Sequence, residues 1–363
     1  MSKQGSGLEC ITADSHNVGW VPYIPDLWIT TVGTFPEDEI WKLNLTYLFK
    51  LAQNRSPEWY LFWQSNRSAL VFRSLGTFVA QSERAVAIKE EADLLKTLSS
   101  FLPWLKLFSR HKFDYQQVEQ SAEKFMVLFI EGADFLLDLS DPWQWLRKNC
   151  ISIVQPLYSH TCRLGSGCYS ATDTGLTTEG KQFIKALAQE GFLIDVSHAS
   201  PMSVAAILDA IESDVIVSHG TSYEVDQSSR GWPEETLQLL RTRCKYFGQM
   251  IGPNPLPTTR LDFPSCVKRR LDYVLDVLGQ DKVGIASDWQ WGWHCDDVLV
   301  KLDKWEAGER ARFISNWQEC GSFVGDYTQR ELLLSLGYPS EVLCDVAGKN
   351  LLRMVDSIAC QHG

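Results

Sequence analysis

The sequence predicts an α/β protein built as a (β/α)8 barrel of the TIM type, with extra helices near its carboxyl end. From residue 115 onward, helical patterns alternate with short apolar segments that read as strands. These segments are apolar almost continuously, which is typical of parallel strands covered on both faces. With two earlier candidates at 9–14 and 69–75, the strands number eight, which favours a closed barrel.

An open doubly wound sheet is the alternative fold. Such a sheet usually has a glycine-rich turn after its first strand, and SHNVGW at 15–20 is not one. The sequence shows no repeat or linker, so we expect a single domain over residues 1–363.

The expected elements follow in chain order. A helix at 37–54 precedes the strand at 69–75, and a second helix begins near residue 82 and should end before Pro103. The later helix and strand pairs are 115–123 with 124–132, 141–149 with 151–160, 177–191 with 192–200, 201–213 with 214–220, 233–243 with 246–254, and 264–279 with 282–289. Residues 326–357 are expected to hold two closing helices.

Composition narrows the class of protein. The formal net charge is −11, so nucleic acid and anionic membrane surfaces are poor partners for this chain. No segment approaches the roughly 20 apolar residues that span a bilayer, and residues 1–17 lack the apolar core of a secretion signal. The ten cysteines are scattered without a C-x-x-C pair, as in proteins with reduced thiols. We therefore expect a cytoplasmic protein.

Side chains able to bind a metal follow six of the expected strands. They are His16, Glu131, His160, His198, His219 and Asp288. In a parallel barrel the carboxyl ends of all strands open on one face, so these residues should converge there. A single histidine or carboxylate at such a place is more often structural. Their joint occurrence favours a site for zinc or a similar divalent ion.

Several stretches, in this order, resemble the renal or membrane dipeptidase family, peptidase family M19. They are DSHN at 14–17, FIEGADFL at 129–136, LYSHTC at 157–162, the segment 175–200 that ends in LIDVSHAS, VIVSHGTS at 215–222, SRGWPEETL at 229–237, VGIASDW at 283–289 and AGKNLLRMV at 347–355. The resemblance is clear from about residue 115; before that it rests on DSHN alone. It implies a zinc-dependent peptidase on a barrel of the amidohydrolase type.

The resemblance also implies a metal-ligand set. Glu131 would bridge two zinc ions, His198 and His219 would complete one metal, and His16 and Asp288 would belong to the other. In this family a metal-bridged hydroxide attacks the amide carbonyl of a dipeptide, because metal lowers the pKa of bound water and polarises the carbonyl.

Three residues acquire further roles by resemblance. His160 would bind the developing oxyanion, Arg230 would hold the terminal carboxylate of the substrate, and Asp288 would pass a proton to the leaving amine. By themselves, Arg230 could form a surface ion pair and His160 could cap the following loop.

The sequence departs from the family at its first strand. The family motif is H-x-D, but here Val18 stands two residues after His16, and valine cannot bind a metal ion. Three alternatives remain: one zinc at Glu131, His198 and His219 with Asp288 as base; two metals with water or another side chain in place of the lost carboxylate; or a pocket that no longer hydrolyses peptides. We favour one metal.

A tryptophan cluster is the second departure. Trp289, Trp291 and Trp293 alternate after the last expected strand, where they could pack in the core or form the wall of a pocket for a flat ligand. His294 and Cys295 beside them could offer a substitute ligand.

The sequence therefore predicts a zinc dipeptidase, with one or two divalent ions, that acts on a dipeptide or a dipeptide-like amide. The alternative is a non-hydrolytic binding or tailoring protein on the same barrel, for example in the biosynthesis of a peptide-derived metabolite. A homodimer is kept as an option, and the side chains of the substrate are not predicted.

Overall fold

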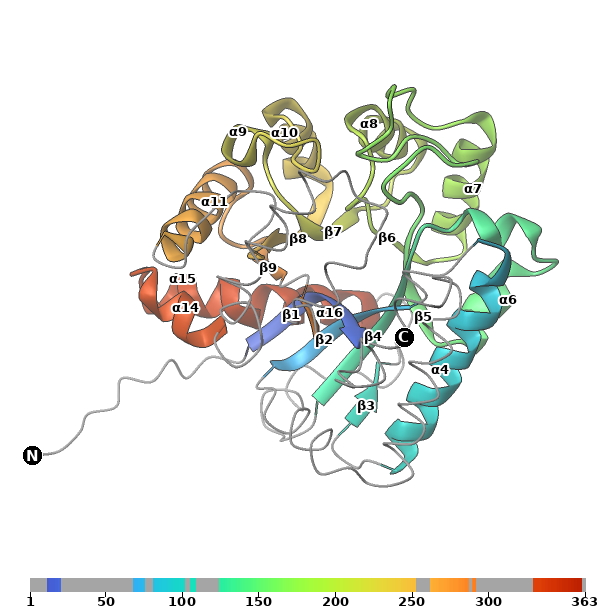
Figure 1. The fold of residues 1–363 in the computed structure, drawn as a ribbon, viewed down its shortest axis with the longest axis horizontal. Coiled ribbons are helices and arrows are strands. Elements are labelled where there is room, and N and C mark those ends of the chain that lie inside the picture. Colours follow the sequence, from blue (N-terminus) through green and yellow to red (C-terminus); the bar gives the residue numbers. More distant parts are fainter. Residues whose placement is uncertain are drawn as a thin grey trace, which may run out of the picture.

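The structure of the protein, a computed structural model, describes residues 12–20, 68–75, 81–101, 105–108, 124–252, 262–286, 289–291 and 329–360 (Figure 1). Within these ranges, eight strands occupy the regions where the sequence predicts strands. They are β1 (Thr12–Trp20), β2 (Ser68–Leu75), β4 (Lys124–Glu131), β5 (Ile151–Gln155), β6 (Leu193–Ile194), β7 (Val215–Gly220), β8 (Cys244–Met250) and β9 (Val283–Ala286). The predicted helices at 37–54 and 115–123 lie outside the described residues.

The strands pair in parallel around a ring. One sheet has the order β10-β1-β2-β4-β5-β6 and the other β7-β8-β9, with the short strand β3 (Leu105–Leu107) beside β4. A parallel bridge from Asp195 to Ile216 joins β6 to β7. At the other junction, β9 pairs with β8, and β10 (Trp289–Trp291), which follows β9 closely, pairs with β1. These pairings confirm the predicted (β/α)8 fold class.

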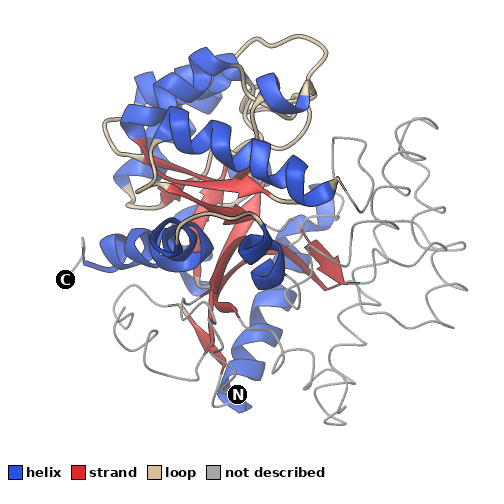
Figure 2. Cartoon of the chain, turned by 90° about the vertical axis from the view of Figure 1, so that its left-hand side faces the viewer, coloured by secondary structure: helices blue, strands red, loops and turns tan. Residues whose placement is uncertain are grey.

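The helices lie outside the strands, as Figures 1 and 2 show. They are α4 (Arg84–Phe101), α6 (Pro142–Lys148), α7 (Thr178–Gln189), α8 (Pro201–Ala210), the short α9 (Tyr223–Asp226), α10 (Glu234–Arg243) and α11 (Phe263–Leu278). Side-chain caps fix several starts: Asp141, Thr177 and Ser200 each accept a hydrogen bond from a backbone N–H in the first turn. As predicted, α4 ends before Pro103.

The segment predicted to contain the closing helices forms α14 (Gln329–Ser335) and a longer helical run. This run consists of α15 (Ser340–Cys344), a π-helical turn (Asp345–Lys349) and α16 (Asn350–Cys360). The Asn350 side chain donates hydrogen bonds to the carbonyl oxygens of Gln280, at 2.6 Å, and Val283, at 2.8 Å. The run is thereby fastened to the start of β9.

Burial on both faces explains the apolar strands. In β4, Phe125, Val127 and Phe129 belong to one buried cluster, whereas the alternate residues Met126 and Leu128 belong to the other. The cluster with Phe129 also contains residues of α16, and the other lies between the strands and the surrounding helices. Because both faces of the strands are buried, apolar and polar residues do not alternate along them in the sequence.

Candidate active site

Two predicted metal ligands meet at the junction of β6 and β7. His198 follows β6 in a turn and His219 lies in β7, and their Nε2 atoms are 2.9 Å apart. The rings meet edge to face with centroids 4.9 Å apart. His198 is 8% exposed and His219 only 1% exposed. The structure therefore brings together two imidazoles that are far apart in sequence and directs the same ring nitrogen of each toward a common point.

A buried serine contacts the other nitrogen of His219. Ser218 Oγ lies 2.9 Å from His219 Nδ1 and donates a hydrogen bond to the Asp195 carboxylate at 2.5 Å. Ser197 Oγ also donates to Asp195 and accepts a bond from the backbone N–H of His219. Burial raises the pKa of the Asp195 carboxyl, and the hydrogen bonds from these serines oppose that rise.

His198 is held from a different side. Its Nδ1 lies 3.4 Å from Ser159 Oγ and 3.8 Å from Cys168 Sγ, and the ring of the half-buried Tyr158 stacks against it at 4.5 Å between centroids. Burial raises the pKa of the Cys168 thiol, which keeps this sulfur protonated. Aromatic packing and the loop after β5 therefore orient this ring.

Arg230 is buried next to the histidine pair and is only 5% exposed. One terminal nitrogen of its guanidinium donates to the Ser197 carbonyl oxygen, and the other donates to that of His219, at 2.9 Å. This burial rules out the surface ion pair that the sequence left open. Arg230 instead fastens the end of β7 to the segment that carries His198.

Glu131 ends β4 and is 1% exposed. Arg84, at the start of α4, donates a hydrogen bond to the backbone oxygen of Glu131. Burial lowers the pKa of Arg84, while the neighbouring charges of Tyr158 and Glu131 oppose this shift. Gly132, which follows Glu131, has φ +75°. A Cβ added there would lie 3.3 Å from the Arg84 guanidinium and 3.2 Å from Tyr158. The turn after Glu131 therefore depends on glycine.

The predicted oxyanion-binding residue lies in the loop after β5. His160 is exposed, and its Nδ1 lies 3.3 Å from the Tyr169 carbonyl oxygen. His16 lies within β1, not at its carboxyl end as predicted, because the strand continues to Trp20. The predictions for Asp288, Trp293, His294 and Cys295 fall outside the described residues.

The strand carrying His16 is longer than predicted because it has partners on both sides. Asn17 pairs with Arg73 of β2 and with Trp289 of β10. These ladders continue the extended backbone through the polar residues that the sequence suggested as a turn. They also set β10, with Trp289 and Trp291, beside the part of β1 that carries Val18.

The histidine pair fits a divalent metal ion. Two nitrogens bound to one tetrahedral zinc lie about 3.3 Å apart, close to the 2.9 Å between these Nε2 atoms. Each opposite ring nitrogen contacts a serine hydroxyl, which can orient the ring as the carboxylate, carbonyl or water partners of metal-binding histidines do. Among the described residues, no group of three or more His, Cys, Asp or Glu side chains is close enough to hold an ion. The described residues thus provide two ligands of the predicted set.

Sequence reasoning missed Asp195, Ser197 and Ser218. Their signal was present, because each histidine of the pair directly follows a serine, and Asp195 ends an apolar segment two residues before Ser197. Hydroxyl groups next to a histidine are too common to assign a role without knowing that the two strands are neighbours.

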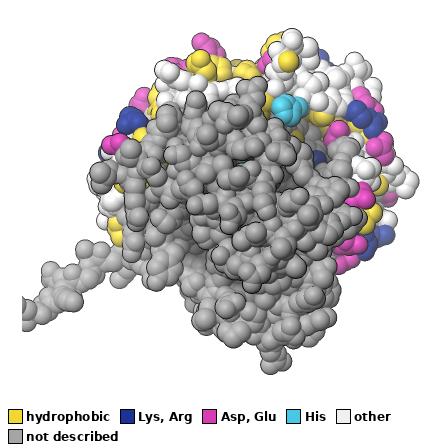
Figure 3. Space-filling view, in the orientation of Figure 1, with side chains coloured by type: hydrophobic (Ala, Val, Ile, Leu, Met, Phe, Trp, Pro, Cys, Tyr) yellow, Lys and Arg dark blue, Asp and Glu magenta, His cyan; other side chains and the backbone are white. Residues whose placement is uncertain are grey.

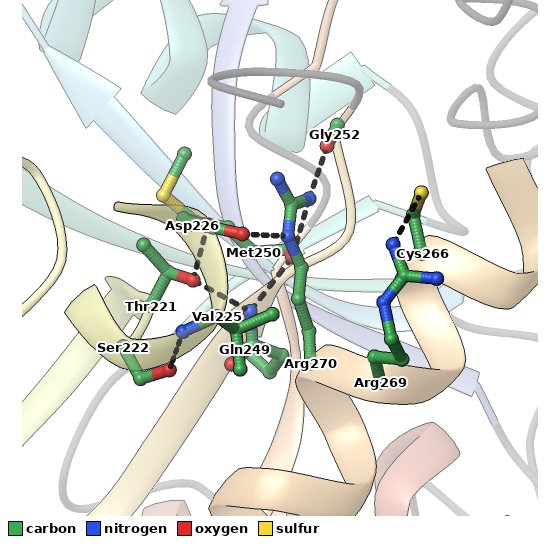
Figure 4. Close-up of polar contacts among 10 residues, drawn as sticks. All are labelled: Thr221, Ser222, Val225, Asp226, Gln249, Met250, Gly252, Cys266, Arg269 and Arg270. Carbon is green, nitrogen blue, oxygen red and sulfur yellow. Dashed lines mark hydrogen bonds and ion pairs between the residues drawn. The ribbon is translucent and has the colours of Figure 1, made fainter. Parts of the chain in front are cut away.

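A second polar cluster lies beyond His219, between β7, β8 and α11 (Figure 4). Arg270 Nε donates to Asp226 at 2.8 Å, and its Nη1 donates to the Gly252 carbonyl oxygen at 2.6 Å. Thr221 Oγ1 donates to the other oxygen of Asp226 at 2.6 Å. Both members of the ion pair are buried, so the cluster fixes the ends of β7 and β8 to α11.

Gly167 packs the loop after β5 against the histidine pair. An added Cβ there would lie 1.7 Å from the Tyr158 carbonyl oxygen, and the next N–H donates to the His198 carbonyl oxygen at 2.8 Å. Gly167→Ala should therefore displace the segment of Tyr158 and reduce stability by about 3 kcal/mol, measured by chemical denaturation. Gly337→Ala is the control, because Gly337 has φ +75° but no atom within 4 Å of an added Cβ, and should cost about 1 kcal/mol. Equal losses in the two variants would contradict the packing argument.

On the face drawn in Figure 3, the described residues show acidic and basic side chains interspersed, and a histidine reaches the surface. Among the described residues, no helix has the length and apolar character needed to cross a membrane.

Comparisons with known proteins give a consistent picture. The model of the membrane dipeptidase family (Peptidase family M19) matches residues 114–298. "Dipeptidase 3" of Rattus norvegicus is 28% identical over 116 residues, which cover 32% of this chain and 24% of that protein. "Dipeptidase aclJ" of Aspergillus oryzae is 24% identical over 186 residues, which cover 51% of this chain and 39% of that protein. The chain spans between 24% and 59% of the length of the first curated relatives that it matches.

The fold has a counterpart among solved structures. A metallo peptidase from Rhodobacter sphaeroides, liganded with a phosphinate mimic of the dipeptide L-Ala-D-Ala, superposes with a TM-score of 0.67 at 14% identity. The superposition covers 96% of this chain and 99% of that one. At this level of identity the likeness shows the fold.

Proposed function

Because the chain belongs to the membrane dipeptidase family (Peptidase family M19), we propose that it is a metal-dependent hydrolase that cleaves a dipeptide or a dipeptide-like amide. The observation that carries the proposal is the pair of buried Nε2 atoms of His198 and His219, 2.9 Å apart at the junction of β6 and β7. Two buried imidazoles whose Nε2 atoms face each other at this distance are well placed to bind one divalent ion.

We propose that His198 and His219 hold one zinc ion and that Glu131, which the family pattern adds as the third ligand, joins them by a change of side-chain conformation, since the three do not form a metal-binding group in the described structure. His16 and Asp288 would belong to a second metal position, which Val18 weakens by removing a carboxylate. When bound, zinc supplies Lewis-acid polarisation of a carbonyl group and lowers the pKa of water. One metal remains our preferred number.

The chain's own residues bind and orient the substrate in this proposal. Two of the five N–H groups of Arg230 donate to backbone oxygens, which leaves three for the terminal carboxylate of a dipeptide. His160 is exposed and able to turn toward the developing oxyanion, and Asp288 would pass a proton to the leaving amine. Both roles come from the family pattern.

A non-hydrolytic binding or tailoring role is the second candidate. It is favoured by the pairing of β10 with β1, which sets the strand with Trp289 and Trp291 beside the strand with Val18. A flat ligand held by tryptophan would need no second metal. Cytoplasmic location and a homodimer remain predictions.

Metal analysis and a hydrolysis assay test the proposal. Purified protein loaded with zinc and desalted should retain about one equivalent and hydrolyse members of a panel of L,L- and L,D-dipeptides; chelation should abolish the activity and added zinc restore it. Val18→Asp should raise the retained zinc toward two equivalents. Two equivalents in the unaltered protein would contradict the one-metal version. Less than about one tenth of an equivalent, with no hydrolysis, would overturn the hydrolase proposal and favour the binding role.

A further inference from the structure

Asp195 lies beneath the histidine pair and is completely buried. Four donors converge on its two oxygens, and Asp195 itself touches neither ring in the described contacts. The donors are the backbone N–H of Ser197 at 3.0 Å, Ser197 Oγ at 2.5 Å, the backbone N–H of Ser218 at 3.1 Å and Ser218 Oγ at 2.5 Å. Burial raises the pKa of this carboxyl group, and the four donors oppose that rise by favouring the ionised form, which can only accept hydrogen bonds.

The hydrogen count determines how these bonds are directed. Each serine hydroxyl has one hydrogen. The two Oγ atoms lie 3.0 Å apart and either could donate in that contact, but the 2.5 Å contacts to the Asp195 carboxylate are shorter and charge-assisted, so both hydroxyls give their hydrogen to Asp195. Ser197 Oγ is then free to accept the backbone N–H of His219, at 3.1 Å. In the contact between Ser218 Oγ and His219 Nδ1, at 2.9 Å, the hydroxyl oxygen must likewise be the acceptor. The hydrogen in that contact is therefore carried by Nδ1 of His219.

We propose that Asp195 is a positioning residue that holds His219 in the Nδ1–H tautomer through Ser218, and thereby directs an unprotonated Nε2 toward His198. A neutral imidazole has one N–H, so a hydrogen on Nδ1 leaves the lone pair on Nε2. The consequence for metal affinity rests on the proposed function, whereas the tautomer itself does not.

The two histidines then differ in which ring nitrogen carries the hydrogen. Their Nε2 atoms are 2.9 Å apart, and a hydrogen bond between them needs one hydrogen. Since His219 Nε2 has none, His198 carries its hydrogen on Nε2 in the metal-free protein. Its Nδ1 then accepts from Ser159 Oγ or Cys168 Sγ, which lie beside it. The metal-free protein should therefore contain opposite tautomers at two adjacent histidines.

Asp195→Asn tests the positioning role with almost no change in shape. The asparagine amide can donate to Ser218 Oγ, whose own hydrogen is then available to His219 Nδ1, and the ring changes to the Nε2–H form. In serine proteases, the same exchange at the aspartate that orients histidine preserves geometry and imposes the wrong tautomer. Zinc affinity should fall about 10- to 100-fold, the usual effect of losing a partner that orients a metal-binding histidine.

The readout is the ¹⁵N spectrum of the imidazoles in metal-free, full-length protein, with His198 and His219 assigned from their single asparagine variants. Unaltered protein should show Nδ1–H at His219 and Nε2–H at His198, and Asp195→Asn should show Nε2–H at His219. Zinc affinity is measured in parallel by competition with a chelator.

Asp173→Asn is the matched control. Asp173 also accepts from a serine hydroxyl, that of Ser200 at 2.6 Å, and from the backbone N–H of Met202 at 2.9 Å. It makes no contact with a histidine among its described hydrogen bonds. This variant should leave both tautomers unchanged. If Asp195→Asn does not fold, Ser218→Ala removes the acceptor and should give a mixture of tautomers at His219.

Nε2–H at His219 in the unaltered protein would overturn the proposal, and so would an unchanged tautomer in Asp195→Asn or Ser218→Ala. If the tautomers are as expected but the protein neither retains zinc nor hydrolyses dipeptides, the proposed function fails and the positioning role of Asp195 stands.

Discussion

Replacement of His219 by alanine is expected to abolish zinc retention and to lower kcat/KM for a dipeptide by about three orders of magnitude or more. His219 is 1% exposed and its Nε2 faces that of His198, so alanine removes one of the two ring nitrogens that the structure brings together. Metal content after desalting and initial rates on the dipeptide that the panel identifies measure the two effects.

The control for this variant is Ser203→Ala. Ser203 is fully buried at the start of α8 and loses its hydrogen bond to the Ser166 carbonyl oxygen, at 2.8 Å. It should lose stability of about 1 kcal/mol but keep its zinc. Retention of zinc by His219→Ala would show that the metal is held elsewhere, and loss in both variants would indicate general unfolding.

The second large effect is expected at the buried ion pair of Figure 4. Asp226→Ala removes the carboxylate that pairs with the Arg270 guanidinium, which is 1% exposed, and Thr221 loses its acceptor. Removing one partner of such a pair typically costs about 3–5 kcal/mol of unfolding free energy, measured by denaturant titration. The free energy of zinc binding should change by less than the free energy of unfolding, because Asp226 contacts Thr221 and Arg270 and not the histidine rings.

The double variant Asp226→Ala with Arg270→Met separates charge from packing. It removes both charges and should recover part of the loss. Lys89→Ala, which breaks an exposed pair with Asp93 on α4, should leave the melting temperature unchanged. If the double variant is less stable than Asp226→Ala, the charge of Arg270 is not the cause of the loss.

The prediction was most accurate where local patterns and tertiary packing agree. The segments at 141–149, 201–213 and 264–279 have caps or prolines at their starts and formed α6, α8 and α11. The positions of His198 and His219 after apolar segments were sufficient to predict that they meet, because parallel strands end on the same face.

The predicted ends of strands were less accurate where pairing with neighbouring strands determines them. The strand expected at 192–200 is only β6, Leu193–Ile194, because beyond it the chain pairs with β7 only through the single bridge from Asp195 to Ile216 and then turns. The strand expected at 9–14 continues to Trp20, because β2 and β10 pair with its polar residues. Neither effect has a local signal, since each depends on segments distant in sequence.

By itself the sequence determined the class of fold and the histidine pair, because the apolar periodicity of buried strands and the residues that end them are local properties. Only the tertiary structure decided what surrounds the pair. In the structure, Arg230 is buried and donates hydrogen bonds to two backbone carbonyl groups, Ser218 links Asp195 to His219, and His160 is exposed. Such hydrogen bonds depend on distances between strands fixed by packing of the whole barrel, and adjacent residues alone do not specify them.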